Sequence, residues 1–130
     1  MIAATTPRVR RILVVDDDRA IREELAAALG NDPALEISLA NDGKEALHLI
    51  GAGRVWPDVI LLALPMMPDF DGDTFLAALD AINRTQQMAV IVMTALPKGE
   101  ISDAVRKRAS AILTKPFTLT AVAAAMRATR

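Results

Sequence analysis

The chain has 130 residues, of which 52% are hydrophobic, and its 15 basic and 16 acidic side chains nearly cancel. This length suits one domain with a single core, and the charge balance provides no global field that would attract nucleic acid or an anionic membrane. The absence of cysteine excludes a disulfide framework, a thiolate metal site and cysteine catalysis, and is typical of a reducing compartment. The apolar stretches are too short to span a bilayer, so we expect a soluble cytoplasmic protein.

The fold is predicted to occupy residues 11–128. Residues 1–10 lack hydrophobic periodicity and are predicted to be a flexible leader. The run 12–15 is rich in branched apolar residues and is stopped by three aspartates, which predicts a first strand buried on both faces. Asp18 can cap the helix that follows, and Gly30 can end it.

The next two units repeat this pattern. Alternating apolar residues predict a second strand over 35–39, and a helix follows from Gly43. The continuous apolar run 59–64 predicts a third strand, which leads through the loop 65–72 into a helix. The chain therefore alternates strand and helix from its beginning.

The last two units complete the predicted architecture. A fourth strand is expected over 89–93, a short polar helix over 100–108, a fifth strand over 111–113 and a closing helix over 119–127. Five such units with fully apolar strands predict an α/β fold, in which a doubly wound, five-stranded parallel sheet carries its five helices on both faces. Ligands of such sheets bind at the carboxyl ends of the strands.

Polar side chains gather at these predicted strand ends. Asp16 and Asp17 follow the first strand, and two adjacent carboxylates would repel each other unless a cation neutralised them. Oxygen ligands of this kind suit magnesium, although helix capping is an alternative role that Asp18 alone could fill. Thr94 and Lys115 follow the fourth and fifth strands, so we expect them at the same edge, with Lys115 paired to one of the two acids.

Four segments of the chain resemble the signature segments of bacterial response-regulator receiver domains. They are VVDDD at 14–18, MMPDFDG at 66–72, MTA at 93–95 and TKPF at 114–117. The resemblance covers residues 11–128 and implies a flavodoxin-like, three-layer sandwich. It also implies a stand-alone cytoplasmic switch, similar to a chemotaxis regulator, that takes a phosphoryl group from a histidine kinase or phosphotransfer protein onto an aspartate.

The family resemblance assigns roles to individual residues of the pocket. Residues matching Asp16 and Asp17 bind magnesium in that family, together with a backbone carbonyl just after the acceptor, here that of Pro65. Residues matching Thr94 and Lys115 receive the phosphoryl oxygens, so they position the group and neutralise its charge. The resemblance also favours a cis peptide bond after Lys115.

The aspartate that accepts the phosphoryl group in the family is missing. Counting forward from 57–62 places its position at Ala63, whereas counting backward from 68–72 places it at Leu64, because this loop is one residue longer. We favour Ala63, since a slip within a strand would exchange core-facing and outward side chains, while an inserted Pro65 costs little. With one carboxylate fewer, magnesium binding is predicted to be weaker. A naturally degenerate receiver and a deliberate Asp-to-Ala substitution would both give this sequence.

The predicted function is therefore a phosphorelay receiver that cannot be phosphorylated as written, and not an enzyme. The alternative is a phosphorylation-independent interaction module that binds a protein partner through its fourth-helix to fifth-helix face, where residues 106–108 form a basic run. Ile112 stands where the family often has an aromatic residue, so coupling through that side chain is expected to differ. A flavodoxin-like enzyme or nucleotide binder is disfavoured, because no glycine-rich phosphate loop follows any predicted strand.

Overall fold

The computed structural model describes residues 9–65, 70–82 and 84–129. Its strands are β1 (Arg10–Val15), β2 (Leu35–Ala40), β3 (Val59–Leu64), β4 (Ala89–Thr94) and β5 (Ala111–Thr114). Its α-helices are α1 (Arg19–Leu29), α2 (Gly43–Gly51), α3 (Gly72–Ala81), α4 (Asp103–Arg108) and α5 (Leu119–Ala128), and the short 3₁₀ helices are η1 (Thr85–Gln87) and η2 (Lys98–Glu100). The strands are all parallel and form one sheet in the order β2-β1-β3-β4-β5, which confirms the predicted doubly wound fold.

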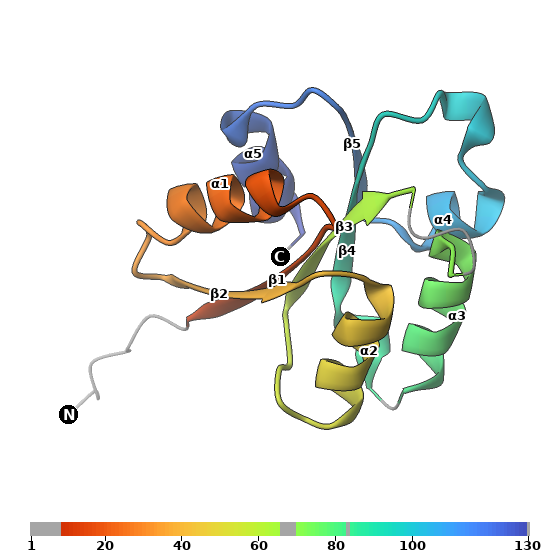
Figure 1. Ribbon diagram of the computed structural model, residues 1–130, viewed down its shortest axis with the longest axis horizontal. Coiled ribbons are helices and arrows are strands. Elements are labelled where there is room, and N and C mark those ends of the chain that lie inside the picture. Colours follow the sequence, from red (N-terminus) through yellow and green to blue (C-terminus); the bar gives the residue numbers. More distant parts are fainter. Residues whose placement is uncertain (1–8, 66–69, 83, 130) are drawn as a thin grey trace.

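Helices cover both faces of the sheet. Figure 1 shows α1 and α5 together on one face, and α2, α3 and α4 on the other. The two hydrophobic clusters agree with this division, because Leu25 and Val122 of α1 and α5 pack in one cluster, while Ile50, Phe75 and Val105 of the other helices pack in the second. The molecule is therefore the expected three-layer sandwich.

The central strand β3 divides its side chains between the two clusters. All six of its residues are buried. Val59, Leu61 and Ala63 pack on the side of α1 and α5, whereas Ile60, Leu62 and Leu64 pack on the side of α2, α3 and α4. This alternation is the ordinary two-residue period of a strand, and it explains why β3 has no polar residue along its length.

A polar side chain caps each α-helix in the described part of the chain. Asp18 accepts hydrogen bonds from the backbone N–H groups of Ala20 and Ile21, which confirms its predicted role. Asp42, Asp71, Ser102 and Thr118 do the same for α2, α3, α4 and α5. Each strand therefore feeds a helix whose start is set locally by one residue.

The predicted helix over 100–108 is wrong in its first three residues. Residues Lys98–Glu100 form η2, Ile101 has extended backbone dihedral angles, and α4 begins only at Asp103. Ile101 is buried in the core, and the hydroxyl of Ser102 accepts a hydrogen bond from the N–H of Val105 at 3.2 Å. A buried side chain and a strong capping residue therefore stop the helix from extending toward the amino terminus.

Other differences from the predicted boundaries are small. β1 begins at Arg10, so the sheet takes in the last residue of the predicted leader, and residues 1–8 lie outside the described part. The peptide bond between Lys115 and Pro116 is cis, as expected, and the bond between Leu64 and Pro65 is also cis, which was not predicted. No helix among the described residues combines the length and the apolar character that crossing a bilayer requires.

Truncating Leu25 should test the cluster between the sheet and α1. The side chain is 1% exposed, so Leu25→Ala is expected to lower the free energy of unfolding by about 2–5 kcal/mol through lost burial and the cavity left behind. The neighbouring Glu24 is exposed, and Glu24→Ala should change stability by less than about 0.5 kcal/mol. Urea denaturation of both variants measures the difference, and equal effects would contradict this packing.

Candidate functional site

A small pocket lies at the carboxyl ends of β1 and β3. Its lining consists of Val15, Asp16, Asp17, Asn41, Asp42, Ala63 and Pro65. The cavity measures about 10 Å³, which is room for roughly one water molecule or ion. Four of the residues singled out from the sequence, Asp16, Asp17, Ala63 and Pro65, are thus brought together at the predicted edge of the sheet.

Asp16 is the buried acid of this pocket. It is 2% exposed, and its Oδ1 accepts a hydrogen bond from the N–H of Asp18 at 2.9 Å. Its Oδ2 has no hydrogen-bond partner but lies 3.5 Å from Nζ of Lys115. This contact is an ion pair without hydrogen-bond geometry, and it confirms the predicted pairing of Lys115 with one of the two acids.

The electrostatics of Asp16 follow from this burial. Loss of solvent raises the pKa of Asp16, and the charge of Asp17 adds to the increase. The hydrogen bond from Asp18 and the ammonium group of Lys115 oppose it without cancelling it. The pocket therefore disfavours the carboxylate form of Asp16, and a further positive charge close to Oδ2 would relieve that cost.

The register of the sheet separates Ala63 from Leu64. Val15 pairs with Leu62, so the next residues along the two strands, Asp16 and Ala63, follow side by side at the edge. Ala63 lines the pocket, whereas Leu64 packs in the cluster on the opposite face of the sheet. Of the two positions obtained by counting along the sequence, only Ala63 lies in the pocket with the acids.

Thr94 reaches the same edge but does not line the pocket. It is fully buried, pairs with Leu64 in the sheet and has its carbonyl bonded to the N–H of Lys115 at 2.7 Å. Its hydroxyl accepts a hydrogen bond from the N–H of Leu96 at 3.0 Å. Thr94 thus lies at the end of β4 as expected, but its hydroxyl is hydrogen-bonded within the turn that follows this strand.

Three polar residues of the site were not predicted from the sequence. Asn41 and Asp42 line the pocket, although Asp42 also caps α2 by accepting from the N–H of Glu45 at 2.8 Å. Arg22 reaches back from α1 to donate to the carbonyl of Asp16 at 2.7 Å. The position of Asn41 and Asp42 directly after β2 was a usable signal, whereas nothing in the spacing of Arg22 indicated its contact.

The donor set fits a magnesium ion in part. Asp16 offers a buried oxygen without a hydrogen bond, and the exposed Asp17 lies beside it. Oxygen donors with water completing the shell are what magnesium prefers. No group of three or more acidic, histidine or cysteine side chains suited to a metal occurs within residues 9–65, 70–82 and 84–129. The segment 66–69, which carries part of one signature, lies outside the described residues.

The basic run at 106–108 does not form one solvated patch. Arg106 donates to the carbonyls of Lys98 and Ile101, so it ties η2 to α4. The Nε of Arg108 lies 3.1 Å from Oδ1 of Asp80. Two of the three cations are thus engaged within the fold, which weakens the interpretation of the run as a docking site.

A doubly wound parallel sheet with a buried acid, a second acid and a lysine at its carboxyl edge defines an α/β domain of the receiver type. The model of the response regulator receiver domain family matches residues 12–127. The chain belongs to this family and is a receiver domain of a two-component system.

Individual relatives agree with this assignment. The chain is 40% identical to response regulator MprA of Mycolicibacterium vanbaalenii over 121 residues, which are 91% of this chain and 49% of the relative. It is 39% identical to response regulator MprA of Mycobacterium avium, with 91% and 50% covered. The chain thus spans about half the length of the curated relatives it matches.

Solved structures show the same fold. The receiver domain of the Francisella response regulator 1452 superposes with a TM-score of 0.74 at 28% identity, covering 92% of this chain and 96% of that one. The Vibrio cholerae chemotaxis protein CheY4 superposes with a TM-score of 0.81 at 24% identity, covering 94% and 99%.

The raised pKa of Asp16 predicts a specific pH dependence. The folded state binds this proton more tightly than the unfolded state, whose pKa is near 3.8, so the stability due to this group falls as the pH rises through the raised pKa. Asp16→Asn is therefore expected to be more stable than the parent at neutral pH, with a gain that disappears as the pH falls toward 3.8. Urea denaturation across this range, with the exposed Glu24→Gln as control, measures the gain. A gain that persists unchanged in acid would refute this explanation.

Proposed function

We propose that this receiver domain is not phosphorylated at the end of its third strand, because Ala63 stands where receivers carry the acceptor aspartate. The support is the placement of Ala63 in the pocket beside Asp16, with Leu64 on the opposite face of the sheet. The side chain of alanine is a methyl group, which has no lone pair to attack phosphorus. The domain therefore takes part in a two-component pathway without forming an aspartyl phosphate at this position.

The rest of the pocket keeps the chemistry of a phosphoryl site. In the proposed role, Asp16, Asp17 and the carbonyl of Pro65 would hold magnesium, which neutralises the charge of phosphoryl oxygens when it is bound. Lys115 neutralises the buried carboxylate of Asp16, from which it lies 3.5 Å. Because one carboxylate is missing, this magnesium site is weaker than that of a complete receiver.

The partner of such a domain is a protein. A cytoplasmic histidine kinase or phosphotransfer protein is the proposed upstream partner, and the surface that runs from α4 across the edge strand β5 to α5 is the proposed surface for a downstream target. The domain acts by binding and not as an enzyme. The observation that favours binding without phosphorylation is again the methyl group at position 63, which removes the usual switching signal.

Restoring a carboxylate at position 63 should restore phosphorylation. After incubation with a small acyl phosphate and magnesium, the parent should carry no label, and Ala63→Asp should gain a label that survives acid and is released by hydroxylamine. Leu64→Asp is the matched control, because that side chain points away from the pocket, and circular dichroism verifies that each variant is folded. Labelling of the parent, or a folded Ala63→Asp that stays unlabelled, would overturn the proposal.

The substitution that restores phosphorylation should also raise the affinity for magnesium. Ala63→Asp adds a carboxylate beside Asp16 and Asp17 and is expected to tighten magnesium binding by about tenfold, which corresponds to about 1.4 kcal/mol. Asp16→Asn removes the buried ligand and should abolish the magnesium-dependent rise in melting temperature. Thermal unfolding at increasing magnesium concentrations, with calcium in parallel, provides the measurement. Equal affinities of the parent and Ala63→Asp would show that position 63 does not face the ion.

A further inference from the structure

Polar contacts attach α4 to α3 at both of its ends. At the amino end, the hydroxyl of Ser102, which caps α4, donates to Oδ1 of Asp73 in the first turn of α3. At the carboxyl end, Nε of Arg108 donates to Oδ1 of Asp80 at 3.1 Å. We refer to these two contacts as the α3–α4 clamp.

The spacing of the clamp residues matches on the two helices. Asp73 and Asp80 lie two turns apart on α3, which puts them on one face with a separation of about 10 Å. Ser102 and Arg108 span the whole of α4, a distance of about 9 Å at the rise of an α-helix. Both contacts can therefore form at once, with the two helices running in the same direction.

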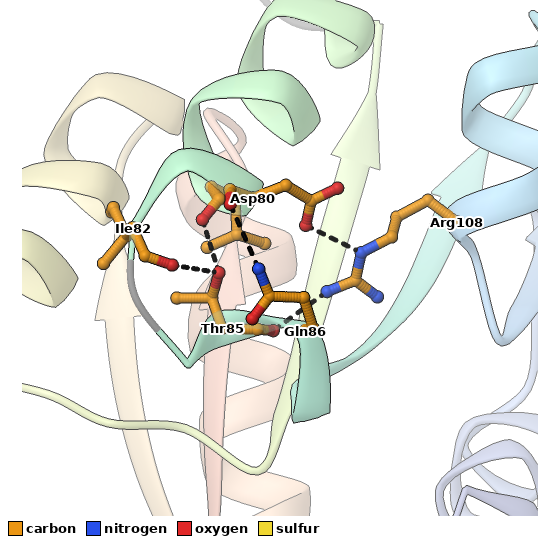
Figure 2. Close-up of polar contacts among 6 residues, drawn as sticks. Asp80, Ile82, Thr85, Gln86 and Arg108 are labelled. Atoms are coloured by element: carbon orange, nitrogen blue, oxygen red, sulfur yellow. Dashed lines mark hydrogen bonds and ion pairs between the residues drawn. The ribbon is translucent and has the colours of Figure 1, made fainter.

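The carboxyl-terminal contact rests on a buried turn. Figure 2 shows Arg108 reaching both Asp80 and Thr85, and its Nη2 donates to the carbonyl of Thr85 at 3.1 Å. Thr85 is fully buried, and its hydroxyl lies 2.9 Å from the carbonyl of Ile82. Gln86 donates to the carbonyl of Asp80 at 3.2 Å. An exposed ion pair alone contributes little, but a pair that shares partners with a fixed network holds its geometry more firmly.

Apolar packing fills the space between the two ends of the clamp. Val105, in the middle of α4, is 3% exposed and belongs to the same cluster as Phe75 and Leu76 of α3. Its Cγ2 would lie 3.5 Å from a Cβ placed on Gly72, so α4 approaches the start of α3 closely. Rolling or sliding α4 would expose Val105 and break both polar contacts.

We propose that the α3–α4 clamp makes α3 and α4 one rigid unit, which presents the outer surface of α4 in a single position. The exposed residues Asp103 and Lys107 lie on that surface.

Hydrogen exchange of the full chain tests the clamp. Asp80→Asn keeps the size of the side chain but removes the charge that Arg108 contacts, and Asp73→Ala removes the oxygen that accepts the hydrogen bond from Ser102. Each variant is expected to raise the exchange rate of peptides covering 100–110 by roughly two- to fivefold, and the double variant should raise it further. Exchange in α1 should stay at the parent rate. Glu24→Gln, a charge-matched change on the exposed side of α1, should alter neither region.

A double-mutant cycle identifies the partner of Asp80. Arg108→Gln combined with Asp80→Asn should increase exchange over 100–110 by less than the product of the two single effects, because both changes remove one contact. Unchanged exchange over 100–110 in the single variants, or an equal rise in all peptides, would refute the clamp. No phosphodonor is used, so failure here leaves the proposal for Ala63 standing, and failure of the labelling experiment leaves the clamp standing.

Discussion

Burial of β3 on both faces is the constraint on which the rest of this structure depends. Each of its six side chains is enclosed by one of two helical layers, so a shift of one residue would exchange the two sets and leave neither core filled. The same constraint places Ala63 at the pocket and Leu64 in the opposite core. Packing along the whole of β3 therefore decides which side chain faces the pocket at the carboxyl edge of the sheet.

The pocket shows how a carboxyl group behaves when it is buried beside one lysine. Asp16 is almost completely buried, and its Oδ2 has no hydrogen-bond partner. The cation paired with this carboxyl group is Lys115, whose Nζ lies 3.5 Å from Oδ2. Burial outweighs this cation in its effect on the pKa. A carboxylate at position 63 would add a negative charge to this balance, and it would make a bound cation more necessary.

Much of the fold and part of the site follow from local sequence. The apolar runs specify the strands, Asp18 specifies the start of α1, and the strand ends bring Asp16 and Lys115 together because parallel strands share an edge. What could not be predicted depends on contacts between distant segments. The burial of Ile101 shortens α4, Leu96 engages the hydroxyl of Thr94, and Asp80 engages Arg108. None of these partners is marked by a spacing in the sequence.

The sheet also separates the pocket residue at position 63 from the packing of α4, so substitutions at these two places need not affect each other. Ala63 belongs to the cluster shared with α1 and α5, whereas Val105 of α4 belongs to the other, and the sheet stands between them. Substitutions on the outer side of α4 can accumulate without repacking the neighbours of the acidic crevice. The exposed residues of α4 and the residue at position 63 can therefore change independently of each other, because neither change requires the other cluster to repack.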